Sequence, residues 1–269
     1  MVNVNLVWND IDGCIGKFEK PSGLDRQNLQ PHLIELAEMK KIMLANPQTT
    51  FAVCTGRSWH LSQDIVNALH INGDSVAEMG QVIYSPNTRK VFPLLPEVKP
   101  ELQSQFTSLK SFIDSSNTFN IENVFGQGRI WRRKDNAYML TYEFDPKIDA
   151  EDVFQFLYTK MSDEIKQGLT QDTIKKVTCD FAIDIRMDIG KGEGIDYLYK
   201  NSYNRDGQRA LGIGDSYHSD IDMFERSEFV ACPANSDEKV KDYVNEKKGY
   251  VAKAEYGQGV IEIYKHFLQ

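Results

Sequence analysis

Two aspartates and a glycine directly follow a short apolar run near the start of the chain, in residues 6–15, LVWNDIDGCI. The apolar run is typical of a buried strand that the glycine ends, so Asp10 and Asp12 are expected at its carboxyl end. Alternation along a strand places both carboxylates on one side, close enough to share a cation. One could act as a nucleophile and the other as an acid or base. The alternative is a surface turn, because Asp and Gly are common turn residues.

A second segment whose groups could bind a ligand follows the strand-like residues 50–54 and precedes a helical pattern over 59–69. It contains a hydroxyl, a flexible glycine and a guanidinium, in Thr55, Gly56 and Arg57. At the end of a strand, these groups could form a cradle for an oxyanion or a phosphate. Taken alone, the segment is explained better by helix capping through Thr55 or Ser58.

The last third of the chain supplies a lysine and a second pair of carboxylates. Lys191 is flanked by glycines, so its ammonium could approach a phosphate closely, although an isolated lysine is more often a plain surface residue. It lies outside any Walker A motif, because the residues around it break that pattern. An apolar run over 209–213 then leads into Gly214 and Asp215, with Asp220 five residues later. A carboxylate pair at a strand end suits a magnesium site.

Composition limits the class of protein. The chain has 269 residues, a net charge of −8 and 41% hydrophobic residues, which are ordinary values for a soluble globular protein. The negative charge argues against a nucleic-acid partner but permits a local positive pocket for an anionic metabolite. No apolar segment is long enough to span a membrane, and no signal-peptide pattern is present. The four cysteines lack C-x-x-C pairing, which indicates reduced core residues and a cytoplasmic location.

The order of elements predicts an α/β fold with an insertion. Strands and helices alternate over residues 1–92 and again over 187–269, as in a parallel sheet. Between them, Pro93, Pro96 and Pro100 mark a linker, and the intervening pattern is helix-strand-strand, twice. The expected helices are 97–115 and 149–167, and paired strands follow each. We therefore expect an inserted antiparallel α+β domain over residues 93–186.

The predicted insertion carries a cluster of basic residues. This cluster consists of Arg129, Arg132, Arg133 and Lys134. A solvated hairpin is the favoured explanation for the cluster, and contact with a substrate is the alternative.

Four segments, in this order, resemble the motifs of the haloacid dehalogenase-like hydrolases. They are Asp10-Ile11-Asp12-Gly13, Thr55-Gly56-Arg57, Lys191-Gly192 and the G-D-x-x-x-x-D stretch from Gly214 to Asp220. An insertion between the second and third motifs resembles the Cof-like and sucrose-phosphatase-like branch of that family. Further segments that resemble this branch are Glu78-Met79-Gly80, Tyr84, Pro233-Ala234-Asn235 and Gly257-Gln258-Gly259-Val260. The resemblance implies a Rossmann-like parallel-sheet core, with residues 93–186 as a cap that determines substrate specificity.

The resemblance also implies a role for each motif residue. Asp10 is expected to attack phosphorus and form an aspartyl phosphate, and Asp12 to act as general acid and then general base. Mg²⁺ is expected to bind Asp10, Asp12 through its carbonyl, and Asp215, with Asp220 as a further ligand or as the residue that orients Lys191 or a metal-bound water. The expected phosphate-binding groups are Thr55, Gly56, Arg57 and Lys191.

Three residues depart from the family pattern. Cys14 replaces a Thr or Val, Ser219 replaces an Asn, and Asn9 occupies a normally apolar position for which the sequence offers no explanation. The resulting hypothesis is a magnesium-dependent phosphomonoesterase of a small phosphorylated metabolite, either a sugar phosphate or a phosphoglycolate-like acid. The alternatives are a sugar phosphomutase of the same fold and a non-catalytic phospholigand-binding protein. The sequence indicates neither the substrate nor the oligomeric state.

Overall fold

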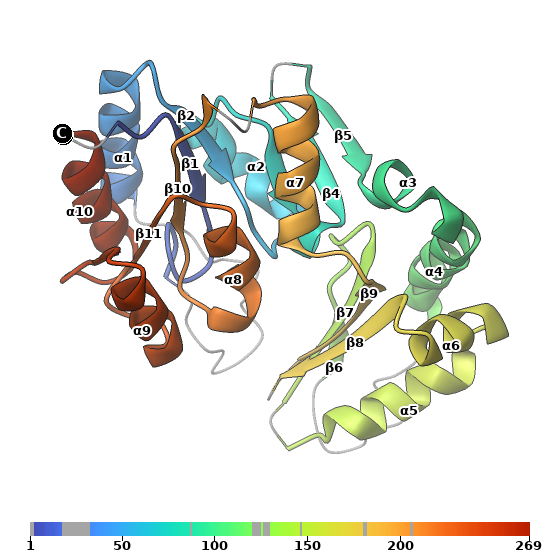
Figure 1. The fold of residues 1–269 in the computed structure, drawn as a ribbon. Coiled ribbons are helices and arrows are strands. Elements are labelled where there is room, and N and C mark those ends of the chain that lie inside the picture. Colours follow the sequence, from blue (N-terminus) through green and yellow to red (C-terminus); the bar gives the residue numbers. More distant parts are fainter. Residues whose placement is uncertain are drawn as a thin grey trace. The chain divides into compact units, whose positions relative to one another are not determined.

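The chain forms two compact units in the computed structural model, which describes residues 3–17, 33–86, 88–119, 125, 130–145, 147–179, 182–204 and 207–269. The core unit comprises Met1–Phe92 and Gly190–Gln269, and the inserted unit comprises Pro93–Ile189 (Figure 1). The second junction therefore lies three residues beyond the end of the expected insertion at residue 186.

The core unit is built on a five-stranded parallel sheet. Its order is β12-β11-β10-β1-β2, so β1 is flanked by β10 and β2. The strands are β1 (Leu6–Asn9), β2 (Thr50–Val53), β10 (Ala210–Ile213), β11 (Phe229–Cys232) and β12 (Tyr250–Val251). Asn9 pairs in register with both Val53 and Ile213. The segments that follow these three strands therefore leave the sheet at the same edge.

Helices cover both faces of this sheet. They are α1 (Leu33–Ala45), α2 (Trp59–Ala68), α7 (Lys191–Asn201), α8 (Tyr217–Glu225), α9 (Glu238–Glu246) and α10 (Tyr256–Leu268). Trp8 packs edge-on against Tyr199 of α7, whereas the neighbouring Asn9 reaches Tyr264 of α10. Because consecutive strand residues point to opposite faces, α7 and α10 lie on opposite sides of the sheet, and α1 packs beside α10 (Figure 1).

Asn9 now has a structural explanation. Its Nδ2 donates to the Tyr264 hydroxyl at 3.2 Å, whereas its buried Oδ1 accepts no hydrogen bond from the described residues. This contact joins β1 to a helix 255 residues away in sequence. Asn9 therefore belongs to the packing of α10 against the sheet.

A small second sheet follows α2 in the core unit. It contains β3 (Ser75–Ala77), β4 (Val82–Ser85) and β5 (Lys90–Pro93), with β3 and β4 antiparallel. β3 ends at Ala77, where a 3₁₀ turn, η2 (Glu78–Gly80), begins. β4 and β5 follow each other in the chain, and Asn87 between them lies outside the described residues.

The inserted unit has an antiparallel sheet and helices. The sheet order is β6-β7-β9-β8. Its strands are β6 (Ile130–Arg132), β7 (Met139–Phe144), β8 (Ile174–Cys179) and β9 (Ala182–Met187). The helical segments are α3 (Leu95–Val98), η3 (Pro100–Leu102), α4 (Gln103–Ser115), η4 (Ser116–Thr118), α5 (Ala150–Lys160) and α6 (Asp163–Thr170).

The predicted helix over 149–167 is wrong as a single element. Ser162 interrupts it, because its side chain accepts the N–H of Ile165 and starts α6 as a new helix. The predicted helix over 97–115 likewise divides into α3, η3 and α4, since Pro100 cannot continue the preceding helical turn.

Each unit has a core of buried apolar side chains, whereas Leu44, Val91 and Val177 are exposed. Cys14, Cys54 and Cys232 are free and buried, and the side chain of Cys179 lies outside the described part of the chain. Among the helices that the structure describes, none combines the length and the apolar character required to cross a bilayer.

Candidate active site

Three motif segments meet where β1, β2 and β10 end. The N–H of Asp10 donates to the Ile213 carbonyl at 2.9 Å, and the N–H of Cys54 donates to the Asn9 carbonyl at 2.9 Å. These bonds extend the parallel ladder by one residue beyond the strands. Asp10, Thr55 and Asp215 consequently follow adjacent strands at one edge, where ligands bind in open parallel sheets.

Lys191 connects the first carboxylate with the last. Its Nζ lies 3.2 Å from Asp10 Oδ1 and 2.6 Å from Asp220 Oδ1. Lys191 is only 1% exposed and Asp220 is fully buried. The alternative of a plain surface lysine is therefore excluded. The burial of one ammonium between two carboxylates fixes all three side chains.

Asp220 also organises the backbone of its own motif. Its Oδ2 accepts the N–H of Asp215 at 2.9 Å and the N–H of Ser216 at 3.0 Å. With Oδ1 on Lys191, both carboxylate oxygens already have donors. This arrangement favours the orienting role for Asp220 over that of a direct metal ligand.

Burial dominates the electrostatics of this cluster. Desolvation, reinforced by neighbouring carboxylates, raises the pKa of Asp10 to about 7 and that of Asp215 to about 9. For Lys191, burial alone opposes the charged form, but attraction to Asp10 and Asp220 outweighs it and holds the pKa above its ordinary value. The site thus holds more carboxylates than one lysine can neutralise, which favours an additional cation.

The donor set fits Mg²⁺. Carboxylate oxygens of Asp10, Asp215 and Asp220 all lie within 4.8 Å of one another. Asp10 Oδ1 is buried and, although close to Lys191, accepts no hydrogen bond from the described residues. Carboxylate oxygens suit a hard divalent cation, and the Asp10 and Asp215 oxygens are less occupied by donors than those of Asp220. Asp12 was expected to bind through its backbone carbonyl, and its side chain stands outside this carboxylate group.

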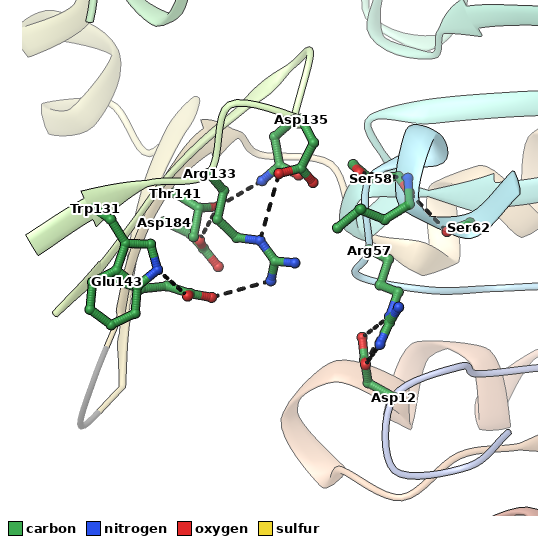
Figure 2. Close-up of polar contacts among 12 residues, drawn as sticks. Asp12, Arg57, Ser58, Ser62, Trp131, Arg133, Asp135, Thr141, Glu143 and Asp184 are labelled. Carbon is green, nitrogen blue, oxygen red and sulfur yellow. Dashed lines mark hydrogen bonds and ion pairs between the residues drawn. The ribbon is translucent and has the colours of Figure 1, made fainter. Parts of the chain in front are cut away.

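Asp12 is held by Arg57 (Figure 2). Arg57 Nη2 lies 2.6 Å from Asp12 Oδ1, and Nε donates to both carboxylate oxygens at 2.8 and 2.9 Å. Arg57 is 7% exposed, while the Asp12 side chain is 32% exposed. In this structure the guanidinium therefore binds the second carboxylate, whereas the sequence predicted a phosphate contact for it.

The capping explanation of the second motif applies to Ser58 and not to Thr55. Ser58 Oγ accepts the N–H of Leu61 and caps α2. Thr55 is fully buried, and its Oγ1 accepts the N–H of Arg57 at 3.1 Å, which tightens the loop around Gly56. Thr55 and Gly56 therefore lie at the sheet edge as predicted, ahead of the helix rather than within its cap.

Sequence reasoning gave no role to Asn235, which the structure places beside the first motif. Its Nδ2 donates to the Gly13 carbonyl at 2.8 Å, and its Oδ1 accepts the N–H of Tyr256 at 2.7 Å. The next turn also contributes, since the N–H of Asp237 donates to the Asp215 carbonyl at 2.9 Å. The available signals were the resemblance of Pro233-Ala234-Asn235 to the family branch and the position of Asn235 shortly after β11.

The remaining departures have ordinary environments. Ser219 donates to the Ser216 carbonyl at 3.3 Å, within the loop that Asp220 organises. Cys14 is buried, and burial raises the pKa of its thiol well above the ordinary value. Neither residue introduces a new charge at the site.

The basic cluster of the inserted unit is only partly solvated. Arg133 Nη1 lies 3.2 Å from Glu143 Oε1, and Glu143 also accepts the Trp131 indole N–H at 2.7 Å (Figure 2). Arg132 donates to the Ile113 carbonyl at 2.9 Å, while Lys134 is exposed. Arg129 lies outside the described residues. The expected solvated hairpin is thus wrong for Arg132 and Arg133, which bind groups of their own unit.

Comparison with solved structures shows how widely this fold is shared. A crystal structure from Thermoplasma acidophilum matches with a TM-score of 0.65 and 17% identity, over 98% of both chains. The sucrose-phosphatase of Synechocystis, in complex with sucrose and phosphate, matches with a TM-score of 0.61 and 15% identity, over 99% of this chain and 98% of that one. At such identities the likeness shows the fold alone.

Sequence comparison finds shorter matches to two phosphoglycolate phosphatases. The protein from Thermoplasma volcanium is 34% identical over 70 residues, which are 26% of this chain and 29% of that protein. The protein from Methanosarcina acetivorans is 34% identical over 90 residues, which are 33% of this chain and 37% of that protein. Each match therefore covers well under half of either sequence.

A family model matches most of the chain. It describes the haloacid dehalogenase-like hydrolases and aligns with residues 35–262, a range that contains Thr55, Lys191, Asp215 and Asp220 and begins after Asp10 and Asp12. The chain belongs to the haloacid dehalogenase-like hydrolases.

Proposed function

We propose that this protein is a magnesium-dependent phosphomonoesterase that acts on a small phosphorylated metabolite through an aspartyl phosphate on Asp10. The observation that carries the proposal is the burial of Asp10 against Lys191, with Asp215 and Asp220 at the same sheet edge. A nucleophilic carboxylate requires positive charge around it before it can approach a phosphate dianion. Lys191 supplies one such charge.

The two aspartates of the first motif have environments that suit different tasks. Asp10 is buried, so its oxygen can attack phosphorus with little competing water, forming an O–P bond as the ester oxygen departs. Asp12 is partly exposed and oriented by Arg57, and in its protonated form it gives its proton to the departing oxygen. It then takes a proton from the water that attacks the aspartyl phosphate, which releases phosphate and restores Asp10.

The other motif residues stabilise the transferring group. Lys191 and the N–H of Gly56 are the proposed ligands of the phosphoryl oxygens, and Thr55 supports the loop that contains Gly56. Asp220 holds Lys191 in position. When bound, Mg²⁺ supplies the positive charge that lets a carboxylate and a phosphate dianion come together. Asp10 and Asp215 are its proposed side-chain ligands, with the Asp12 carbonyl.

Substrate selection is proposed for the inserted unit. Its antiparallel sheet carries both charged and aromatic side chains, which is chemistry suited to a polar metabolite. Sugar phosphates and phosphoglycolate-like acids are the two proposed classes, since the names of the similar proteins include phosphoglycolate phosphatase and sucrose-phosphatase. A cytoplasmic location is part of the same proposal.

The test is phosphate release from a panel of phosphorylated sugars and small acids, with magnesium and with a chelator. Wild type, Asp10→Asn and Asp12→Asn are compared with Asp64→Asn, a change at an exposed position of α2. We expect release that requires magnesium, a loss of about 100-fold or more in kcat for the two site variants, and no change for Asp64→Asn.

Other outcomes identify the alternatives. Isomerised sugar phosphate with little free phosphate indicates a phosphomutase. Binding of phosphorylated ligands without turnover indicates a phospholigand-binding protein. Full activity in Asp10→Asn contradicts the aspartyl-phosphate mechanism.

A further inference from the structure

Three consecutive left-handed residues lie beside the phosphate-binding segments of the core unit. They form η2, where the φ angles of Glu78, Met79 and Gly80 are 50°, 54° and 97°. This conformation is easy for glycine but costly for Glu and Met, whose Cβ crowds the backbone. Two successive non-glycine residues of this kind persist only where their surroundings enforce the conformation. The contacts of the turn show what enforces it.

One side of the turn holds the second motif through main-chain hydrogen bonds. The N–H of Met79 donates to the Thr55 carbonyl at 3.2 Å, and the N–H of Glu78 donates to the Arg57 carbonyl at 2.8 Å. The Met79 side chain lies against Gly56, since a Cβ added to Gly56 would come within 2.9 Å of Met79 Sδ. The turn therefore contacts all three residues from 55 to 57.

These bonds determine where the Gly56 amide points. In a trans peptide the C=O and the following N–H point in opposite directions, and no cis peptide is found in the described chain. Because the Thr55 carbonyl is directed at Met79, the N–H of Gly56 is directed away from the turn. The left-handed backbone at Met79 thus orients the N–H of Gly56, which is a phosphate ligand in the proposed function.

The other side of the turn touches the start of α7. A Cβ added to Gly80 would lie 2.0 Å from the Gly190 carbonyl oxygen and 2.3 Å from its carbonyl carbon. Gly190 is the residue before Lys191 and serves as the N-cap of α7. A side chain at position 80 would therefore displace the peptide that begins the lysine motif.

We propose that Glu78–Gly80 is a positioning element, which sets the Gly56 N–H and Lys191 in a fixed relation to each other. This inference rests on the proposed function, because it treats both groups as phosphate ligands. The turn itself touches no reacting atom. Its action is to hold the two halves of the phosphate-binding site through backbone contacts.

The first test places at position 79 residues that differ in how easily they adopt a left-handed backbone. The series Met79→Gly, Met79→Asn, Met79→Ala and Met79→Val runs from most to least tolerant. The readouts are kcat, KM, the dissociation constant for inorganic phosphate with magnesium, and Tm. We expect Gly and Asn to stay within about threefold of wild type and Val to lose about tenfold in both kcat and phosphate affinity.

The second test uses Gly80→Ala with Gly207→Ala as its control, because a Cβ on Gly207 meets no atom within 4 Å. We expect about tenfold weaker phosphate binding for Gly80→Ala and wild-type binding for Gly207→Ala. The inference is overturned if phosphate affinity does not follow the order of the position 79 series, or if Gly80→Ala matches its control.

The binding measurements separate this inference from the proposed function. A wild-type protein that binds inorganic phosphate but hydrolyses no ester overturns the proposed function, and the affinities of the variants still decide the role of the turn. A wild-type protein that binds no phosphate overturns the inference itself.

Discussion

Asp10 and Asp12 are chemically identical residues that the structure places in different environments. Asp10 is buried beside Lys191, whereas Asp12 is partly exposed and bound to Arg57. Two carboxylates with different surroundings can divide nucleophilic and proton-transfer roles between them. The Arg57 contact is the less expected of the two, because it gives the second motif a function in holding the first.

We predict that Arg57→Lys lowers kcat by about tenfold or more and leaves KM nearly unchanged, because lysine keeps the charge but loses the forked contact that orients Asp12. Steady-state kinetics on a substrate identified from the panel provide the measurement. Arg209→Lys is the matched control, since Arg209 makes a similar forked contact with Glu228 but precedes β10, at the opposite end of the strand from Asp215. An equal effect of the two substitutions would contradict the orienting role.

The turn after β1 is the element that brings the first and last motifs together. Gly13 N–H donates to the Gly16 carbonyl at 2.9 Å, and Gly16 N–H donates to the Ile11 carbonyl at 2.8 Å. Gly13 has a φ of 74°, and a Cβ there would lie 2.0 Å from Asp215 Oδ2. Only glycine lets this turn approach the Asp215 carboxylate so closely.

We predict that Gly13→Ala abolishes magnesium binding and lowers kcat by about 100-fold or more, because the added methyl group occupies the space of the Asp215 carboxylate. Gly16→Ala lies in the same turn, but its added Cβ would be 3.7 Å from the Ile11 carbonyl oxygen, an ordinary van der Waals distance, so it should behave as wild type. Calorimetric titration with magnesium, together with kinetics, tests the pair. Normal magnesium affinity in Gly13→Ala would contradict this assignment of the site.

At the scale of the whole molecule, the carboxylate cluster links stability to pH. The pKa values of Asp10 and Asp215 are raised to about 7 and about 9, from an ordinary value of 3.8. Between pH 3.8 and these raised pKa values, the folded protein binds more protons than the unfolded chain. Stability of the metal-free protein therefore falls as pH rises through this range, as far as these two groups are concerned.

We predict that magnesium raises Tm by several degrees more at about pH 8.5 than at about pH 6, because the metal binds carboxylates in the charged form that burial disfavours. For a protein of this size, Tm changes by about 2–4 °C for each kcal/mol. Thermal unfolding with magnesium and with a chelator at both pH values provides the measurement. In the double variant Asp10→Asn with Asp215→Asn, the difference between the two pH values should disappear.

The sequence by itself indicated the family, the parallel sheet and the residues at its edge. Asp10, Thr55 and Asp215 could be placed because each follows an apolar strand, and parallel strands of one sheet end at a common edge. Lys191 was found because its flanking glycines and its order in the chain match a motif. Information of this kind is local, since residue type and strand periodicity are readable within a short window.

Only the tertiary structure decided which side chains pair. Arg57 binds Asp12 across 45 residues, Asn9 reaches Tyr264 across 255, and Asn235 reaches Gly13 across 222. Such contacts depend on how helices and loops pack over the sheet, and no periodic pattern in the sequence encodes them. The left-handed turn at Met79 was hidden for the same reason, because its conformation is enforced by neighbours that are distant in the chain.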